Sequence, residues 1–217
     1  MTAPTISLLG TSALLFEAPG NTDLPTQRRI WTMARAVTDW PETGEAVPGM
    51  NNLMLRFAAP PRRLDAIIER LLTAWEAAEP MALDGQLVEL QVVYGGDGGP
   101  HLAEVLAHTG LGIDDLVSLH TAPEYIVYAL GSHPGYCYLG GMDPRLATPR
   151  RKVPALRIPG GAVSIGGSQT GVSASDGPSG WNTIGTTTAR FFDPDRHPPA
   201  LLRPGDRLRL HPAKVIR

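Results

Sequence analysis

Apolar residues recur at helical spacing in two segments of the first half of the chain. Residues 64–75 place leucine, isoleucine and tryptophan three or four positions apart, which is typical of an amphipathic helix. A similar pattern covers residues 30–40 and ends at Pro41, because proline lacks the N–H that a helix needs. Short apolar runs predict four strands in this half, at Thr5–Leu9, Ala13–Glu17, Asn52–Phe57 and residues 87–94.

The order of these elements predicts an α+β lobe over residues 1–95. The series strand, strand, helix, strand, helix, strand favours a sheet with two helices on one face, and a ferredoxin-like arrangement is one candidate. The glycine cluster at residues 95–99 is the natural boundary of this lobe. It contains no GKS or GKT, so we interpret it as a hinge and not as a phosphate-binding P-loop.

The second half, residues 96–217, has a different pattern. Two short helices are predicted first, at residues 102–109 and from residue 112 onward. Many short apolar runs separated by glycine and proline follow, and they predict a β-barrel or a compact β-rich lobe. The predicted strands of this lobe are residues 125–130, 162–165, 183–184, 189–192 and 207–210.

Composition narrows the classes of function. The 217 residues have a formal net charge of −2, with 42% hydrophobic and 18% charged residues, which fits a globular protein. We therefore expect no general attraction to nucleic acid or to a membrane surface. The single cysteine, Cys137, excludes an intrachain disulfide. We see no signal peptide and no membrane-spanning apolar run, and so expect a cytoplasmic protein.

Chemistry-bearing residues gather between residues 120 and 181. His120 and His133 flank the strand at 125–130 and could share a pocket, although a lone histidine is more often structural. Neither histidine has a partner at a diagnostic spacing, and no cluster with metal-ligand spacing is present. Five cations between Arg145 and Arg157 alternate with prolines. They form either a solvated face or a fixed edge that binds a carboxylate or phosphate.

Neutral hydrogen-bonding residues accompany the glycines of the same region. Ser164, Ser168, Gln169 and Thr170 lie between glycine pairs, and further serines follow up to Trp181. No GxSxG elbow is present, so a hydrolase-type serine nucleophile is not supported. No basic residue at a diagnostic spacing indicates that the Cys137 thiol is activated, so we expect Cys137 to be a packed residue.

Several motifs together resemble a known family. Residues 138–171 read YLGGMDPRLATPRRKVPALRIPGGAVSIGGSQTG, residues 180–181 read GW, and residues 201–210 read LLRPGDRLRL. Upstream, residues 92–120 read VVYGGDGGPHLAEVLAHTGLGIDDLVSLH. This run is similar to the KipI family, the carboxyltransferase domain, subdomain C and D. That family includes the B-type subunit of the ATP-dependent bacterial 5-oxoprolinase and subunit 1 of allophanate hydrolase.

The resemblance implies a small α+β lobe followed by a cyclophilin-like β-barrel. It also implies a C-type partner protein, similar to allophanate hydrolase subunit 2, and a possible A-type partner protein. Together such proteins convert 5-oxoproline, ATP and water to glutamate. ATP is expected to act in the complex and not to bind to this chain alone, and no metal or organic cofactor is implied.

The resemblance also implies a pocket. Mapped onto this sequence, and combined with residue chemistry, it gives two catalytic candidates: His120 for proton transfer and Gln169 to orient an amide or carboxylate. Arg150 or Arg151 would neutralise an anion. The substrate-binding candidates are His133, Pro134, Gly135, Tyr138, Arg150, Arg151, Gly161, Ser168 and Trp181, with no metal ligand, and Gly140, Pro159 and Gly180 complete the family pocket.

Two other functions fit the same motifs. One is a KipI-like regulatory protein that inhibits a histidine kinase by docking. The other is a carboxyltransferase-like protein that acts, as part of a complex, on another small amide such as urea or allophanate. The sequence departs from the family's usual pattern at His101, at residues 132–133 and at residues 175–179, all near the implied pocket.

Overall fold

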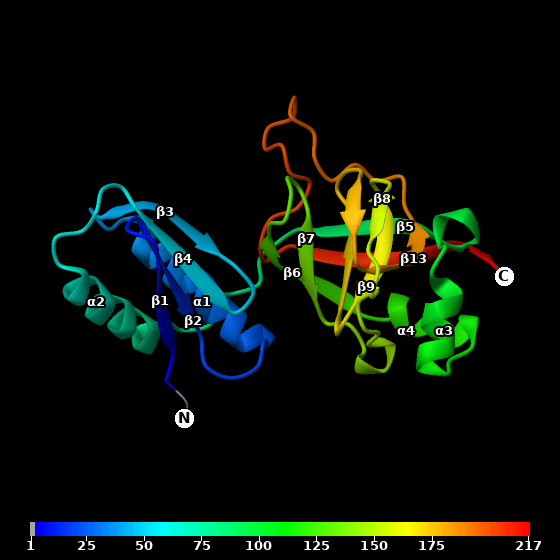
Figure 1. Cartoon of the computed structure of the whole chain (residues 1–217), viewed down its shortest axis with the longest axis horizontal. Coiled ribbons are helices and arrows are strands. Elements are labelled where there is room, and N and C mark those ends of the chain that lie inside the picture. The colour runs from blue at the N-terminus through cyan, green and yellow to red at the C-terminus, as the bar shows by residue number, and fades with distance from the viewer. Residues whose placement is uncertain (1–2) are drawn as a thin grey trace. The chain divides into compact units, whose positions relative to one another are not determined.

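The computed structural model describes residues 3–217, and the chain divides into two compact units, Met1–Leu83 and Asp84–Arg217 (Figure 1). The first unit contains a four-stranded antiparallel sheet and two helices. Its elements in chain order are β1 (Thr5–Leu9), β2 (Ala13–Glu17), α1 (Leu24–Thr38), β3 (Thr43–Pro48), β4 (Asn52–Phe57) and α2 (Leu64–Ala77).

The sheet of the first unit has the strand order β1-β2-β4-β3. This is the ferredoxin-like arrangement with its last strand moved to the start of the chain. Leu14 faces Leu55, and Phe16 faces Leu53, across the β2–β4 pair. These side chains form one cluster with the buried residues of α1 and α2, so both helices cover the same face of the sheet.

A closed seven-stranded barrel forms most of the second unit, with the strand order β10-β7-β6-β13-β5-β12-β9. The barrel strands are β5 (Leu87–Gly95), β6 (Glu124–Leu130), β7 (Cys137–Gly140), β9 (Ala162–Gly166), β10 (Gln169–Val172), β12 (Asn182–Thr186) and β13 (Arg207–Ile216). The other elements are α3 (Leu102–Thr109), α4 (Ile113–Thr121), the short helices η1 (Gly96–Gly98) and η2 (Pro144–Leu146), β8 (Ala155–Ile158) and β11 (Gly177–Ser179).

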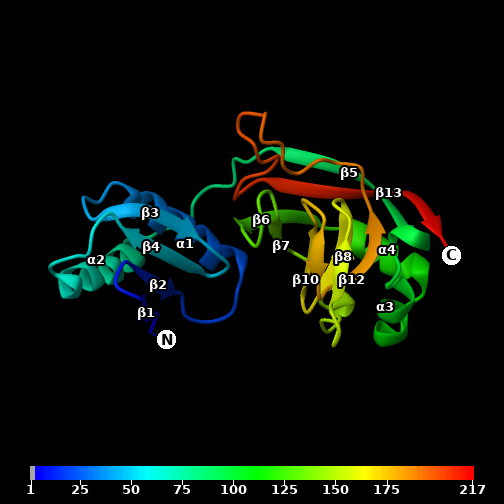
Figure 2. The same cartoon turned by 45° about the horizontal axis from the view of Figure 1, so that its top comes forward.

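The barrel interior is packed with side chains from alternate strand positions. Leu90 and Val92 of β5, and Leu208 and Leu210 of β13, belong to one large core cluster. Helices α3 and α4 add Val105, Leu116 and other residues to this cluster, and they lie next to each other beside the barrel (Figures 1 and 2). Strands β8 and β11 pair only with each other, outside the barrel order. We call this two-stranded sheet the ribbon.

The boundary between the two units differs from the sequence prediction. We expected it at residues 95–96, but β5 is a barrel strand, so the first unit ends at Leu83. Strand β5 pairs in parallel with β13 and antiparallel with β12, and both lie far along the chain. The glycines at residues 95–99 therefore lie inside the barrel unit, where Gly95 and Gly96 take positive φ angles of 76° and 56°.

Smaller differences concern individual elements. Strand β3 was not predicted, because its glycine and glutamate dilute the apolar pattern. The strand predicted at residues 189–192 is wrong, since only an isolated bridge joins Phe192 to Ala200 there. Helix α1 begins at Leu24, where the Asp23 side chain accepts a hydrogen bond from the Thr26 N–H at 2.8 Å. Among residues 3–217, no helix is both long and apolar enough to cross a bilayer.

Candidate functional site

Two cavities of about 240 and 210 Å³ lie beside the ribbon. They adjoin, because both are lined by Ser132, His133, Ser173 and Pro178. We call the two together the ribbon groove. Its other lining residues are Ile158, Ser175, Asp176 and Gly177 in the first cavity, and Tyr136, Tyr138, Arg150, Ser179, Gly180 and Trp181 in the second.

A tight loop at residues 131–136 forms one side of the groove. The His133 N–H donates to the Gly131 carbonyl at 2.7 Å, and the Tyr136 N–H donates to the His133 carbonyl at 3.1 Å. Ser132 takes a φ angle of 64°, a conformation that is costly for a residue with a side chain. Strained backbone of this kind gathers at binding sites, where the surrounding structure holds it in place.

Aromatic rings form the floor of the second cavity. The ring centre of Tyr136 lies 5.1 Å from those of His133 and Tyr138, and 6.2 Å from that of Trp181. Glycine is needed beneath this cluster, because a Cβ on Gly166 would lie 2.5–2.6 Å from the Trp181 indole. A Cβ on Gly171 would lie 2.8 Å from the Tyr136 hydroxyl. The glycines of β9 and β10 thus allow the rings to lie directly on the barrel wall.

Replacing Gly166 by alanine should therefore displace Trp181 and destabilise the barrel by about 2 kcal/mol, the usual cost of overpacking. Urea unfolding of the two proteins measures this difference. Gly177→Ala is the matched control, because a Cβ at Gly177 would meet no atom within 4 Å. Equal losses of stability in the two variants would contradict the close approach of Trp181 to β9.

The charges around the groove favour an anionic ligand. The Arg150 guanidinium lies 5.7 Å from the centre of the Trp181 ring, and Arg150 makes no ion pair within residues 3–217. Burial lowers the pKa of His133, and its Nε2 atom is buried without a hydrogen-bond partner. A cation, a neutral imidazole and several serine hydroxyls suit a small carboxylate with further polar groups.

Asp176, the carboxylate among the described residues that line the groove, is already engaged. It accepts hydrogen bonds from the Arg157 side chain at 2.5 Å and from the Gly160 N–H at 2.9 Å. The Arg157 contact is the main cause of the lowered pKa of Asp176, and the Gly160 contact adds to it. Asp176 therefore stays ionised and does not act as a general acid. Its role is structural, because it links Arg157 of β8 to the turn at Gly160.

Four of the predicted substrate-binding residues line the groove together: His133, Tyr138, Arg150 and Trp181. Pro134 and Gly135 lie in the loop that carries His133 but not in the groove lining. Gly135 has a φ angle of 81° and packs against Phe191 and Phe192, which fixes the loop on the barrel. These two positions shape the site without contacting the cavities.

The remaining predicted binding residues lie outside the groove lining. The Arg151 side chain pairs with Glu104 at 2.6 Å. Its backbone N–H donates to the carbonyl of Gly180, a groove residue, so Arg151 holds the groove wall in place without lining the cavity. Gly161 takes a φ angle of 85° at a turn where a Cβ would lie 2.1 Å from the Thr187 carbonyl oxygen. Ser168 is exposed at the β9–β10 turn.

Gln169 begins β10 and lies on the outer face of the barrel. Side chains alternate along a strand, so Gln169 is on the same face as Gly171, which packs against Tyr136 and Trp181. It pairs with Gly166, which also contacts Trp181. Gln169 therefore lies next to the aromatic floor, although it does not line either cavity. Its catalytic role stays a prediction.

His120 lies in the barrel core and not in the groove. It has no exposed surface, and both of its ring nitrogens make 2.8 Å hydrogen bonds, Nδ1 with the Tyr94 hydroxyl and Nε2 with Thr170 Oγ1. The Thr170 hydroxyl donates to the Ser164 carbonyl, so it accepts from Nε2–H, and the Tyr94 hydroxyl donates to Nδ1. Burial lowers the pKa of His120 to about 4, which agrees with this neutral form.

Sequence reasoning did not select several groove residues. Ser132 and Tyr136 neighbour the predicted His133, but the positive φ of one and the packing of the other depend on the folded loop. Ser173 is indicated only by the polar run before Trp181, whereas Ser175 and Asp176 also belong to the departure from the family pattern at residues 175–179. Their place opposite His133 becomes visible only once β11 pairs with β8.

Two other features carry no reactive site. The Cys137 thiol is buried, and burial raises its pKa to about 12, as expected for a packed residue. A larger cavity of about 530 Å³ is lined by Gln86, Arg203 and Asp206, among others. The buried Asp206 carboxylate there accepts hydrogen bonds from the backbone N–H groups of Gln86 and Arg203. Asp206 therefore stabilises the backbone around it and is not available for chemistry in the cavity. No cluster of metal-binding side chains occurs among the described residues.

Comparisons with known proteins match this fold and these motifs. The model of the family "Carboxyltransferase domain, subdomain C and D" matches residues 4–202. The B-type subunit of the 5-oxoprolinase of Escherichia coli O157:H7 is 45% identical over 207 residues, which are 95% of each chain. The crystal structure of TTHA0988 is 34% identical with a TM-score of 0.77, over 93% of this chain and 40% of that chain.

A more distant structure supports the fold alone. The urea amidolyase of K. lactis is 16% identical, with a TM-score of 0.81 over 97% of this chain and 15% of that chain. The family model covers most of the chain, and the E. coli relative matches along nearly its whole length. The chain therefore belongs to the carboxyltransferase domain family, subdomain C and D, which the sequence motifs predicted.

Proposed function

We propose that this chain is the B-type subunit of an ATP-dependent 5-oxoprolinase. In that role it cooperates with a C-type protein, and with an A-type protein, to convert 5-oxoproline, ATP and water to glutamate. The observation that carries the proposal is the 45% identity to the B-type subunit of the E. coli 5-oxoprolinase over 95% of both chains. The reaction consumes ATP, which fits the cytoplasmic location that we expect.

The ribbon groove supports this proposal through its chemistry. 5-Oxoproline carries a carboxylate and a lactam amide on one small ring. Arg150 can bind the carboxylate, since it has no ion-pair partner in the described part of the chain. His133 Nε2, which lacks a partner, can exchange a hydrogen bond with the lactam. The serines at 132, 173 and 179 supply further hydroxyls around the ring.

The other steps of the reaction are assigned to the assembly. This chain has no P-loop sequence, so we propose that ATP binds in the complex and not to this chain alone. Gln169, beside the aromatic floor, would orient the substrate amide once a partner completes the site. His120 would hold β10 in place from the core side and would not touch the substrate.

Reconstitution tests the proposal. The chain is co-expressed with the C-type and A-type proteins of the same genome, and ATP hydrolysis is measured with and without 5-oxoproline. We expect 5-oxoproline-dependent hydrolysis that requires all three proteins, with glutamate as the product. Each two-protein combination serves as a control, because a single contaminating ATPase would not depend on all three.

Two other outcomes would indicate a different function. A stable complex without 5-oxoproline-dependent turnover would indicate that the substrate is another small amide, such as urea or allophanate. The absence of any complex would favour a regulatory protein that docks on a histidine kinase. Either result would reject the 5-oxoprolinase proposal.

A further inference from the structure

The ribbon and the chain that leads into it expose two large apolar side chains to water. Leu156 on β8 is 92% exposed, and Val153 just before β8 is 74% exposed. No other large apolar side chain in the described residues is as exposed; the next, Leu8, is 56% exposed. Such exposure is unfavourable in water, and a cluster of this kind on a projecting element is typical of a contact surface.

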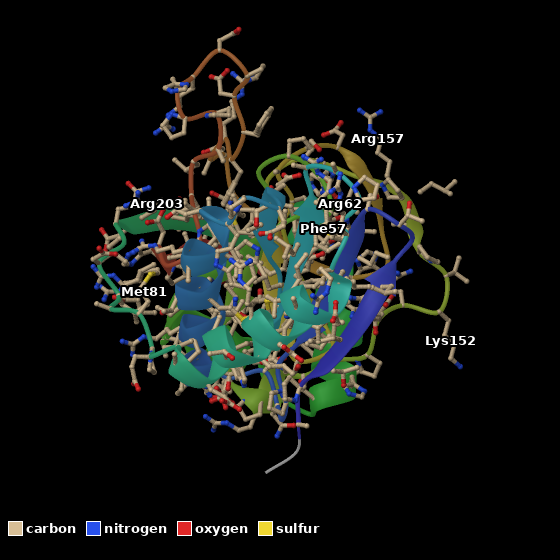
Figure 3. The ribbon with its side chains drawn as sticks, turned by 90° about the vertical axis from the view of Figure 1, so that its left-hand side faces the viewer. Phe57, Arg62, Met81, Lys152, Arg157 and Arg203 are labelled. Carbon is tan, nitrogen blue, oxygen red and sulfur yellow. The ribbon has the colours of Figure 1, made fainter. Side chains whose placement is uncertain are left out.

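Positive charge surrounds these two side chains. Lys152, in the loop before β8, and Arg157, on β8, flank them in the sequence, and both side chains point outward (Figure 3). Arg157 pairs with Asp176, which belongs to the turn before β11, whereas Lys152 has no ion pair within residues 3–217. Arg150 lies two residues before Lys152 in the sequence, but it lines the ribbon groove and is assigned there to the substrate. The patch is therefore apolar at its centre and cationic at its margin.

The ribbon is a small sheet that no barrel strand extends. It has only two strands with an irregular register, and a two-stranded sheet is marginally stable on its own. Ile158, the last residue of β8, is buried and lines the ribbon groove. The exposed side chains lie just before Ile158 in the sequence, so a molecule bound to them would lie at the wall of the groove.

The charges decide which kind of molecule fits. A second copy of this chain on the same patch would bring the unpaired Lys152 of each copy close together, and like charges at close range oppose association. An acidic partner would pair with Lys152, which has no ion pair within residues 3–217 and does not line the groove. A larger assembly also fits the comparisons, because the matching region is only 40% of the TTHA0988 chain and the E. coli relative is named as a subunit.

We propose that residues 152–157, on β8 and the loop that leads into it, dock the companion C-type protein, which contributes an apolar patch with an acidic margin. This inference rests on the proposed function and names the surface through which the assembly forms. Docking at this place covers Leu156 and Val153 and fixes the ribbon over the groove. Assembly thereby stabilises the substrate site, which links activity to the presence of the partner.

A binding titration with charge and size variants tests the docking surface. The probe is the purified C-type protein of the same genome, titrated against the wild-type chain and against Leu156→Asp. We expect Leu156→Asp to weaken binding about 10-fold or more, as for a buried apolar residue at the centre of an interface. Lys152→Glu should weaken it about 3-fold and reduce its dependence on salt, as for a charge at the rim.

Leu8→Asp is the matched control, because Leu8 is also an exposed leucine but lies on β1 of the first unit. It should bind as the wild-type chain does. Thermal unfolding of all variants shows whether each is folded. In the three-protein assay, Leu156→Asp should lose activity at low partner concentration and recover it when the partner is in excess, which an effect on chemistry would not do.

The outcomes separate the two proposals. If the wild-type chain binds the C-type protein and folded Leu156→Asp binds equally well, the docking surface is rejected and the proposed function stands. If the wild-type chain forms no complex, both are rejected. If the isolated chain is a dimer that Leu156→Asp converts to a monomer, a second copy occupies the patch and the proposed partner is wrong.

Discussion

Replacing Arg150 by alanine should lower kcat/KM for 5-oxoproline about 100-fold in the reconstituted complex, the loss expected when a charge-assisted contact to a substrate carboxylate is removed. Arg150 lines the second cavity of the groove over Trp181 and makes no ion pair within residues 3–217. Its positive charge is therefore available to a ligand. Because Arg150 is exposed and outside the core, the free energy of unfolding should change by less than about 0.5 kcal/mol.

Two further variants make the Arg150 experiment specific. Arg145→Ala removes a cation whose partner is Asp143, at 2.7 Å and outside the groove, and it should keep wild-type kinetics. Arg150→Lys keeps the charge but loses the two-pronged guanidinium contact, so its kcat/KM should lie between those of wild type and Arg150→Ala. A similar loss in Arg145→Ala would mean that general surface charge, and not the groove, attracts the substrate.

The helices and many strands could be predicted from the sequence because their patterns are local. Helix α3, Leu102–Thr109, has the predicted limits, and a buried stripe of its side chains joins the barrel core. The boundary between the units could not be found in the same way. Strand β5 follows α2 directly, but its partners β12 and β13 lie about a hundred residues later, and no local pattern reveals that pairing.

The groove was partly predictable for a related reason. Tyr138, Arg150 and Trp181 lie in the stretches that carry the resemblance, whereas His133 lies where the sequence departs from the family pattern, and the fold brings all four to one place. The pairing of β8 with β11 adds the serines opposite them. No spacing in the sequence indicates this contact, because the two strands are separated by β9 and β10, which pair within the barrel.

The position of His120 did have a sequence signal. His120 follows Leu116 by four residues and Val117 by three, so all three lie on one face of α4, and that face is buried. A histidine on an apolar helix face is expected inside the core. Its hydrogen bond to Thr170 nevertheless connects it to the site, because Thr170 faces inward while its neighbours Gln169 and Gly171 face outward toward the aromatic floor.

The stabilising effect of His120 should depend strongly on pH. In the folded chain, burial lowers the pKa of His120 from 6.5 to about 4. Between these values the unfolded chain binds a proton at this position and the folded chain does not, so stability falls as the pH falls. At 1.36 kcal/mol for each pKa unit, the loss between pH 7 and pH 4 is about 3 kcal/mol.

Comparing wild type with His120→Leu isolates this effect. At neutral pH the variant should be less stable by about 3 kcal/mol, because the Tyr94 and Thr170 hydroxyls lose their partner in the core. As the pH falls from about 6.5 to 4 the two stabilities should converge, since only the wild-type chain must avoid protonating His120. Hydrogen exchange of β10 amides at each pH measures the barrel's stability separately from the first unit.

An exposed histidine gives the control for this comparison. His108 on α3 is exposed, so His108→Gln should keep both the stability and the pH dependence of the wild-type chain. The contributions of the other histidines cancel in the difference between wild type and His120→Leu. Two stability curves that remain parallel from pH 7 to pH 4 would mean that the imidazole is protonated within the fold. The Tyr94–His120–Thr170 chain of hydrogen bonds would then have to run in another direction, because an imidazolium donates from both nitrogens.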